Sequence, residues 1–550
     1  MKKIISLFIL LIVIINTQAQ NVGVGTNTPS QKAILEVASS NKGFLPPRLF
    51  EDSILAMGVV EAGMVVYNKT RDCLMIFNGT KWQCTGGGSR SNSFELDALS
   101  FYAGADSCTS SSINSITSLS NGEYCVTGTF TGAKMDLGNG KVLNALPSSN
   151  NGFVAKYAGT GVCQWAVKLL SLNTTTTIEP LSIDAAGSGS VFITGRFNDS
   201  MALFNANGSF FNKLSNDVAG DMDIFMLKIN ADGDIGWRRR EGNSGGIDEG
   251  HVIKTIGNLV FIAGQFHGSQ NFGTGTPFPL TVYGGLDGFY ARYDTATGTV
   301  CSYAMKLGGV GDDDVLDIYT GGGSIYLTGS YETSFLTLPA NIASLGGKDM
   351  FIAKYPVGIS NASWVECARG TGFETGSAID VQGTDLFVAG FFSSASISFT
   401  NGFPVQSNNG NIDGMVLKVP AFSGAPTITS WIKTLGGSDN DIINDLAVSN
   451  SGTCTVVGHF SNYLRFHNNY PIYATGAQDG FMASFINATG DLYKVAKAAS
   501  LYNDACNALV IKANNDITIG GYSGQPLNLN GTEINKPLSS NGQALLWILK

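Results

Sequence analysis

Val126-Thr127-Gly128-Thr129-Phe130 decides the fold, because the same pattern returns along the chain. A short apolar run ends in glycine, and an aromatic residue usually follows two positions later. The copies are spaced 61 to 69 residues apart, and a fixed period of this length indicates a repeat architecture. The repeat glycines are Gly128, Gly195, Gly264, Gly329, Gly390, Gly458 and Gly521.

Two further motifs complete each repeat unit. An Asp or Asn opens an apolar run, as at Asn151 and Asp287, and an aromatic residue such as Trp165 follows later. Turn signals such as Asn121-Gly122 separate the runs. Each unit therefore predicts four short strands, whereas a helical solenoid would show a 3.6-residue period. We predict an all-β fold, a seven-bladed β-propeller of four-stranded antiparallel blades over residues 93–550.

The fourth-strand aromatic occurs six times rather than seven. The chain ends inside the third strand of the last unit, at Leu546-Trp547-Ile548 and two further residues. Residues 93–102 can supply the missing outer strand and pair with the C-terminal strand, which would remove an open sheet edge. Because the aromatics share one repeat position, we expect them to pack between neighbouring units rather than to act as sugar platforms.

The composition agrees with short strands joined by tight turns. Glycine supplies 69 of the 550 residues, and charged residues make up only 14%. Hydrophobic residues reach 43%, which is enough for a large core. The net charge of −9 argues against a nucleic-acid partner.

The N-terminus has the pattern of a signal peptide. Lys2 and Lys3 precede the apolar run 4–15, which is too short to span a bilayer, and cleavage after Ala19 fits the small residues there. Residues 1–19 thus predict export, so we expect the mature protein to be secreted or held at the cell surface. No transmembrane segment is expected in the rest of the chain.

Residues 20–85 do not fit the repeat and predict a small β-rich head module, which a Gly/Ser linker at 86–92 joins to the propeller. In this module we predict a disulfide between Cys73 and Cys84. A two-residue turn at Asn78-Gly79 would place these cysteines directly opposite each other, within bridging distance. The other seven cysteines stay unassigned, and the odd total of nine leaves at least one unpaired.

The repeat pattern resembles a known family. A glycine-ended strand, then Asp-Gly-Phe-x-Ala-Lys-Tyr, then Trp, is similar to the seven-bladed propeller repeats called SBBP, which implies the same fold for residues 93–550. That family consists mostly of uncharacterised exported proteins, so the resemblance implies little about activity. The head module, with Val22-Gly23-Val24-Gly25 near its start, looks like the head of exported bacterial surface proteins, similar to tail-fibre segments. Such segments often trimerise, and the resemblance therefore raises a homotrimer.

One stretch has the appearance of a catalytic motif. Gly242-Asn243-Ser244-Gly245-Gly246 resembles the Gly-Asp-Ser-Gly-Gly of serine proteases, whose chemistry needs a strained elbow or a protease barrel and a histidine base. Here it falls between two repeat units, where sister repeats also carry paired glycines. We therefore predict a turn and no catalytic role.

Acidic residues gather in the connections between units. In a four-stranded antiparallel blade these connections leave from the same face as the loops between the second and third strands, so we expect one acidic face. Two interpretations stay open: the carboxylates cap turn backbones, or they bind Ca²⁺ through hard oxygen ligands. The calcium candidates are Asp312, Asp313, Asp314, Asp439 and Asp441.

We expect an exported, non-catalytic binding or surface-interaction protein whose functional surface is this acidic face, because binding residues favour variable loops on a rigid frame. We expect no cofactor, apart from Ca²⁺ if the carboxylates bind it. The partner would be an extracellular protein or glycan. Two alternatives stay open: an extracellular enzyme that uses carboxylates at the central opening on a polysaccharide, and a purely structural part of an extracellular assembly.

Overall fold

The computed structural model divides the chain into two compact units, residues 1–90 and 91–550. The described residues are 22–26, 28, 33, 35–49, 53–54, 57, 60–69, 73–79, 82–85, 101–103, 108–216, 218, 220–243, 245–274, 277–337, 340–400, 402–420, 431–466, 470–524, 527–529, 532–534 and 543–549. The predicted signal peptide at 1–19, the predicted linker at 86–92 and Ser244 lie outside them. Within the described part of the chain, no helix is long and apolar enough to cross a membrane.

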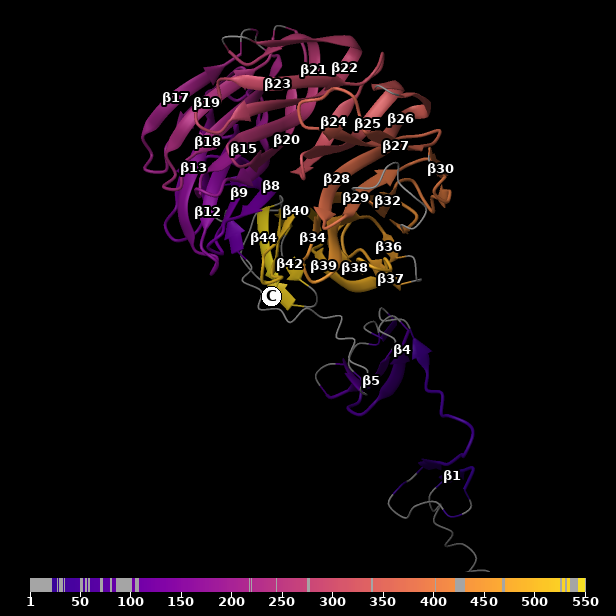
Figure 1. Cartoon of the computed structure of the whole chain (residues 1–550). Coiled ribbons are helices and arrows are strands. Elements are labelled where there is room, and N and C mark those ends of the chain that lie inside the picture. The colour runs from indigo at the N-terminus through magenta and orange to yellow at the C-terminus, as the bar shows by residue number, and fades with distance from the viewer. Residues whose placement is uncertain are drawn as a thin grey trace, which may run out of the picture. The chain divides into compact units, whose positions relative to one another are not determined.

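The second unit is all-β, and its sheets follow one another around a common centre (Figure 1). Each repeat sheet has four core strands in which neighbours run antiparallel. The first three contain β8 (Cys108–Ser118), β9 (Tyr124–Gly132), β12 (Asn150–Tyr157) and β13 (Cys163–Ser171); β14 (Ile178–Ala185), β15 (Val191–Asn198), β18 (Met222–Ile229) and β19 (Ile235–Glu241); and β20 (Glu249–Ile256), β21 (Leu259–Phe272), β22 (Phe278–Asp294) and β23 (Cys301–Leu307).

The remaining sheets repeat this order. The next three contain β24 (Asp314–Gly321), β25 (Ser324–Thr337), β26 (Ala340–Pro356) and β27 (Trp364–Arg369); β28 (Glu374–Gln382), β29 (Asp385–Phe392), β32 (Asp413–Pro420) and β33 (Ile432–Gly436); and β34 (Asp441–Val448), β35 (Thr453–Phe460), β38 (Asp479–Ile486) and β39 (Leu492–Ala499). The last sheet has the order β40 (Ala505–Ile511), β41 (Ile517–Ser523), β44 (Gln543–Leu549) and β7 (Phe101–Ala103).

Hairpins from one repeat extend the sheet of the repeat before it. β16 (Ser200–Phe204) and β17 (Phe210–Ser215) lie between β15 and β18 in sequence, yet β16 pairs with β13 of the preceding sheet. Three further hairpins do the same: β30 (Ser396–Phe399) with β31 (Gln406–Ser407), β36 (Tyr463–Phe466) with β37 (Tyr470–Tyr473), and β42 (Leu527–Leu529) with β43 (Thr532–Ile534). β10 (Lys134–Asp136) and β11 (Val142–Asn144) form a separate hairpin. The exchanged hairpins hold neighbouring sheets together.

The first strand of each sheet carries a β-bulge opposite the repeat glycine. In β14, for example, Leu181 is the extra residue between Pro180, which pairs with Gly195, and Ser182. A Cβ atom added to any repeat glycine would lie 1.9–2.2 Å from a carbonyl oxygen of the bulged strand. Only glycine allows this close approach, which gives the repeat glycines a common structural role. The bulged residues are Asn114, Leu181, His251, Leu316, Ser377, Asn444 and Asn507.

Three fourth-strand tryptophans, Trp165, Trp237 and Trp431, form a hydrogen bond to the following sheet. Trp165 Nε1 donates to the carbonyl of Ala231 at 3.0 Å, in the turn that joins β18 to β19. Trp237 and Trp431 make the same contact with the following sheet, at 3.2 and 2.9 Å. A Cβ atom at Gly298 would lie 2.7 Å from the Trp237 ring. The tryptophans therefore pack between neighbouring repeats, as their shared position predicted.

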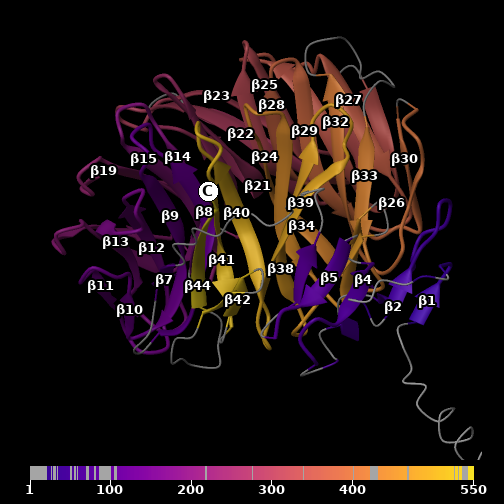
Figure 2. The ribbon, with the colours of Figure 1, turned by 90° about the horizontal axis from the view of Figure 1, so that it is seen from below.

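The last sheet is completed by the strand that precedes the first. β7 pairs antiparallel with β44, with Tyr102 opposite Leu545, which confirms the predicted pairing between this segment and the C-terminal strand. The first and last sheets also touch: Asn507 Nδ2 donates to the carbonyl of Ile113 at 3.0 Å. Figures 1 and 2 both show β40 and β44 beside β8.

The first unit contains two small sheets. β1 (Val22–Val24) runs parallel to β2 (Leu35–Val37). β3 (Arg48–Leu49), β4 (Val65–Asn68), β5 (Cys73–Phe77) and β6 (Trp82–Thr85) form the other sheet, in that order. Ile54, Val66 and Met75 form its small core.

The register of the β5–β6 hairpin corrects the argument for the disulfide. Phe77 pairs with Trp82 and Met75 pairs with Cys84, so four residues rather than two separate the first pair. Cys73 is then diagonal to Cys84, and diagonal neighbours lie about 7–8 Å apart, beyond the usual Cα separation of about 4.4–6.8 Å in disulfides. The predicted direct pairing of Cys73 with Cys84 was wrong, because four residues rather than two separate Phe77 from Trp82, while the disulfide itself stays a prediction.

The close approach at the repeat glycines predicts a large effect of one methyl group. In Gly390→Ala the new Cβ would meet the carbonyl oxygen of Thr375 at 2.1 Å, so either the bulge or β29 must shift. We expect a loss of about 3 kcal/mol or more in the free energy of unfolding, measured by urea titration. Gly187→Ala is the control, because a Cβ there meets nothing within 4 Å. Equal stability of the two variants would contradict the role of the glycine.

The pairing of β7 with β44 predicts that a six-residue deletion destabilises the whole second unit. Removing residues 98–103 would expose an edge of the last sheet, and we expect the melting temperature to fall by about 5 °C or more. Removal of six residues at 86–91 is the length-matched control and should change it by no more than about 2 °C. Differential scanning calorimetry compares them, and equal melting temperatures would refute closure by β7.

Candidate functional site: the central opening, its rim and a seam pocket

The first strands of all the repeat sheets line a central cavity of about 560 Å³. At its wall, bulged side chains link each sheet to the next by donating to a carbonyl just before the next bulge. Asn114 Nδ2 donates to Pro180 O at 2.9 Å, and Asn444 Nδ2 donates to Cys506 O at 3.0 Å. Ser377 Oγ reaches Ile443 O at 2.7 Å in the same way. Leu181 and Leu316 occupy this position in two sheets and cannot donate.

Four aspartates and one lysine supply the charge of the cavity wall: Asp184, Asp317, Asp380, Asp445 and Lys254. Each aspartate accepts a backbone N–H from the following sheet. Asp317 Oδ2 accepts from Ile379 at 2.8 Å, and Asp445 Oδ2 accepts from Leu509 at 2.7 Å. Asp184 and Asp380 bind Thr255 and Val448 in the same way. The first strand of a sheet has an open edge, and these carboxylates satisfy part of it.

The protein around these groups shifts their pKa values. Burial raises the pKa of Asp380 to about 6 and that of Asp445 to about 7, although backbone N–H donors oppose the shift. Burial alone would lower the pKa of Lys254, but Asp317 and Asp184, with the two other aspartates, raise it overall. The four carboxyl groups thus stabilise the protonated form of Lys254 in the central cavity.

The contacts that these four carboxyl groups make join each first strand to the first strand of the following sheet. All four carboxylates are engaged by backbone donors, and within the described residues no group of three or more His, Cys, Asp or Glu could hold a metal ion. Sequence reasoning missed these residues. The pairs Ile183-Asp184 and Ile379-Asp380 recur at one repeat position, and aligning the repeats on their glycines could have shown that.

The rim carries the connections between sheets and the loops between second and third strands, at the same end of the unit. Parallel bridges join the two sets, as between Met222 and Ile247 and between Ile412 and Asn440. The predicted common face for these loops is therefore confirmed. Its predicted acidity is not, because the carboxylates turn inward.

The rim carboxylates bind their own loops. Asp441 Oδ2 accepts from Gly437 N at 2.5 Å, and Asp313 Oδ2 accepts from Gly309 N at 2.6 Å, in each case four residues earlier. Both aspartates are only 1% exposed. The carboxylates that open the third strands do likewise: Asp287 and Asp349 accept the N–H of Tyr283 and Leu345. Of the two open interpretations, the structure shows turn capping.

The calcium candidates do not form a ligand set. Asp312 accepts from Leu286 N at 2.9 Å, and Asp314 accepts from Ser330 N at 3.1 Å. Asp439 accepts only from Ser438 Oγ in its own loop, at 2.8 Å. Together with Asp313 and Asp441, these carboxylates are divided between two separate connections, and all of them except Asp439 accept a backbone N–H. The calcium hypothesis therefore gains no support from the described residues.

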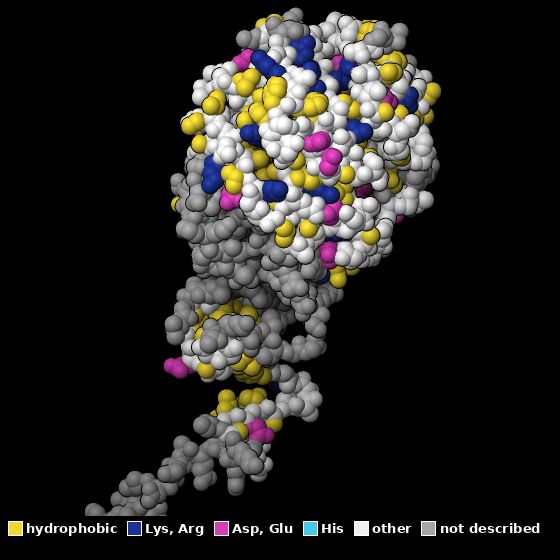
Figure 3. All heavy atoms as spheres, turned by 90° about the vertical axis from the view of Figure 1, so that its left-hand side faces the viewer, with side chains coloured by type: hydrophobic (Ala, Val, Ile, Leu, Met, Phe, Trp, Pro, Cys, Tyr) yellow, Lys and Arg dark blue, Asp and Glu magenta, His cyan; other side chains and the backbone are white. Residues whose placement is uncertain are grey.

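The rim exposes apolar side chains where acidic ones were expected. The connections expose Val310, Phe373 and Leu501, at 64%, 61% and 70% of their surface. Tyr283 of β22 and Leu345 of β26 are also exposed, in the parts of these strands that precede the pairing with the fourth strand. On the side of the molecule in Figure 3, charged side chains of both signs are spread among uncharged ones. Exposed apolar side chains on several loops of one rim are a feature of contact surfaces.

The cysteines of the second unit are structural. Cys108, Cys125, Cys163, Cys301, Cys367, Cys454 and Cys506 are all buried and free. Burial raises the pKa of the thiols of Cys125 and Cys163 to about 12, so both stay protonated at neutral pH. They act as small core residues rather than as nucleophiles.

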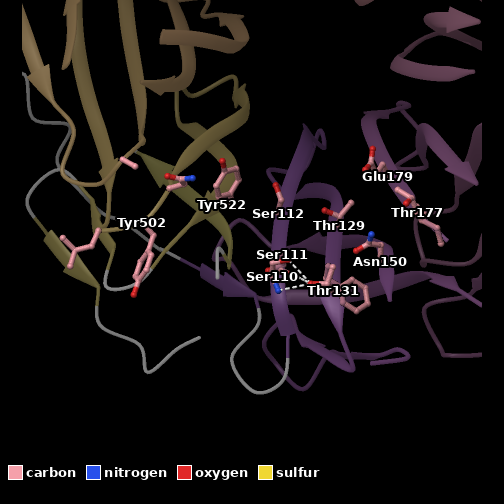
Figure 4. Close-up of a pocket in the computed structure, with 15 residues that line it drawn as sticks. Ser110, Ser111, Ser112, Thr129, Thr131, Asn150, Thr177, Glu179, Tyr502 and Tyr522 are labelled. Carbon is pink, nitrogen blue, oxygen red and sulfur yellow. Dashed lines mark hydrogen bonds between the residues drawn. The ribbon is translucent and has the colours of Figure 1, made fainter. Parts of the chain in front are cut away.

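A second cavity, of about 770 Å³, opens at the seam where the last sheet meets the first two (Figure 4). Figure 4 shows hydroxyl side chains of β8 and β9 on one side and Tyr502 and Tyr522 on the other. Glu179 is the charged residue of the wall, and Arg196 pairs with it at 2.5 Å. Arg196 also contacts Glu249, and the pKa of Glu249 falls to about 2 because His251 and Arg196 outweigh its burial.

Comparisons with known proteins identify the first unit more clearly than the second. A family model described as a phage tail like trimerisation region matches residues 23–97. The resemblance of the head to tail-fibre segments is thus confirmed, while that of the repeats to SBBP stays a resemblance. A search of the curated proteins finds no match to this sequence.

Three solved structures show distant likeness. A europium-containing methanol dehydrogenase is 9% identical with a TM-score of 0.32, over 77% of this chain and 85% of that chain. A point mutant of the NanB sialidase from Streptococcus pneumoniae is 10% identical with a TM-score of 0.28, over 75% and 65%. Drosophila plexin A, in complex with semaphorin 1b, is 8% identical with a TM-score of 0.27, over 66% and 84%. With TM-scores this low, these likenesses carry no argument about activity.

The buried carboxyls predict a pH dependence of stability. Burial raises the pKa of Asp248 to about 7 and those of Asp313 and Asp441 to about 8. Such groups hold a proton in the folded chain at pH values where the unfolded chain, with a pKa of about 3.9, has lost it. The free energy of unfolding should therefore fall as pH rises from about 4 to about 8. Melting temperatures across this range check the prediction.

The matched variant is Asp441→Asn, which keeps an acceptor oxygen for Gly437 but cannot titrate. Its melting temperature should fall less steeply with pH than that of the wild type. Asp232→Asn, in an exposed turn, should leave the slope unchanged. A wild-type protein that grows more stable from pH 4 to pH 8 would contradict the prediction.

Proposed function

We propose that the second unit is a closed seven-bladed β-propeller. Each repeat glycine lies on the second strand of its own sheet, and three contacts besides β7 support closure between the last and first sheets. Asn507 donates to Ile113 O at 3.0 Å, Lys512 Nζ donates to Gly122 O at 3.0 Å, and Ala544 N donates to Ser111 Oγ at 2.8 Å. A closed ring explains why the central cavity is lined by the first strand of every sheet.

We propose further that the first unit forms a homotrimer. The observation that carries it is the exposure of apolar side chains on β1 and β2, which lie within the matched segment 23–97 except for Val22, directly before it. Val22, Val24, Leu35 and Val37 are all exposed on this two-stranded sheet. A two-stranded sheet is marginally stable alone, so contact with further copies of the chain would bury these residues and stabilise it.

The function that follows is multivalent binding outside the cell: an exported, non-catalytic protein that displays three propellers on one trimeric head. The signal-peptide pattern supports export. The engagement of the central and rim carboxylates by backbone donors supports binding over catalysis. Linking three propellers raises the apparent affinity for a repetitive extracellular surface without any new contact within a single propeller.

The trimer is tested by the mass of the mature chain in solution. We expect light scattering after size exclusion to give three chain masses, and we expect Leu35→Asp to shift the protein to a single chain mass, because a charge would be buried in the head contact. Val405→Asp is the control, since Val405 is exposed to 62% in the second unit. A wild-type monomer would contradict the proposed display, as would a Leu35→Asp variant that stays trimeric.

A further inference from the structure

We propose that the seam pocket binds a neutral saccharide. The inference rests on the proposed binding function and gives it a ligand class. The pocket is formed by parts of the chain that lie far apart in sequence: β8, β9 and β14 on one side, and the connection around Tyr502 with Tyr522 of β41 on the other (Figure 4). A volume of about 770 Å³ falls within the range of small-molecule sites.

The pocket opens where the repeat lacks its rim carboxylate. In five sheets the residue opposite the second-strand aromatic is a buried acid; in the last of them, Ser523 stands in place of the aromatic. The five acids are Asp248, Asp313, Glu374, Asp441 and Asp504. Three of these acids, Asp313, Asp441 and Asp504, accept an N–H from the connection before their strand. In the first two sheets the same position holds Ser111, opposite Phe130, and Ile178, opposite Phe197. Both line the pocket, so the missing acids coincide with the open space.

The wall formed by β8, β9 and β14 carries hydroxyl and amide groups that a ligand could bind. Ser110 and Thr131 bond to each other at 2.8 Å, which fixes their hydroxyls at the pocket floor. The side chains of Thr129, Asn150 and Thr177 also line the pocket, and among the described residues they have no side-chain hydrogen-bond partner. Hydroxyl and amide groups both donate and accept, which matches the hydroxyl groups of a sugar.

The opposite wall supplies aromatic surface. Tyr502 is 43% exposed, and its ring is therefore open to contact. Tyr522 is fixed, because its hydroxyl accepts from Gln478 Nε2 at 3.2 Å. An aromatic ring packs against the C–H face of a pyranose, while neighbouring polar groups bind its hydroxyls. Tyrosine suits this position because it is apolar on the ring and polar at the tip.

The charge of the pocket selects against ionic ligands. Glu179 is the charged residue in the wall, and its carboxylate is paired with Arg196. An anionic saccharide would meet Glu179 with no free cation in the described wall to bind it. A cationic ligand would have to compete with Arg196 for the one carboxylate. An uncharged ligand rich in hydroxyl groups fits the wall best.

The test is titration calorimetry of the full mature chain with four neutral hexasaccharides: cellohexaose, xylohexaose, mannohexaose and maltohexaose. Hexagalacturonate is the anionic probe. We expect at least one neutral probe to bind and hexagalacturonate not to. Tyr502→Ala and Thr129→Val should each weaken that binding by about tenfold or more, because they remove the aromatic contact and one hydroxyl. Tyr502 is exposed, so its truncation leaves the core intact.

Tyr493→Ala is the matched control, because Tyr493 is an equally exposed tyrosine outside the pocket. It should change the affinity by less than about twofold. The inference is overturned if no neutral probe binds the folded wild type, if only hexagalacturonate binds, or if binding survives both pocket variants. Saccharide binding that survives them would still support a binding protein, and chain mass in solution tests the trimer separately, so the two proposals fail independently.

Discussion

The contact on which the second unit depends is the approach of a backbone carbonyl to a glycine Cα. In each sheet the bulged first strand brings this oxygen so close to the second strand that a Cβ atom would meet it at about 2 Å. The bulge changes the direction of one side chain, so that Asn114, Asn444 and Asn507 reach the next sheet. The glycine therefore shapes its own sheet and, wherever the bulged residue is polar, permits a hydrogen bond to the neighbouring sheet.

The strands, the repeat glycines and the pairing of β7 with β44 could be predicted, because each follows from a period or from a count along the chain. The side chains that line the central cavity could not be predicted, because they depend on the position of the β-bulge. Two strand registers that differ by one residue would place different side chains in the cavity. Cys73 and Cys84 show the same limit: the turn residues Asn78-Gly79 are visible in sequence, but the loop contains four residues. The exchange of hairpins between sheets, as with β16 and β13, also leaves no local signal.

The rim shows why acidic residues were misread. The sequence gives the position of a carboxylate along the chain but not the direction in which it points. Here the carboxylate accepts the backbone N–H of the residue four positions earlier, so it points back into its own loop. Asp287, Asp349 and Asp441 share this geometry. Turning the charge inward leaves the loop tips to residues such as Phe373 and Leu501, which are exposed. A face rich in acids by composition thus exposes apolar side chains at several of its loop tips.

The departures from the repeat are the informative positions, because a residue with the same structural task in every sheet carries little individual chemistry. Five sheets have a buried acid opposite the last residue of the second-strand motif. The first two sheets have Ser111 and Ile178 at this position instead, and both residues border the seam pocket. The same reasoning applies at the centre, where Lys254 occupies the position that holds Asp184 and Asp380 in other sheets. In a scaffold made of near-equivalent sheets, a site arises where the structural residue is absent and the space it fastened stays open. Hydrogen bonds between the first and last sheets bring these two repeats together at that place, so the pocket combines residues from both ends of the second unit.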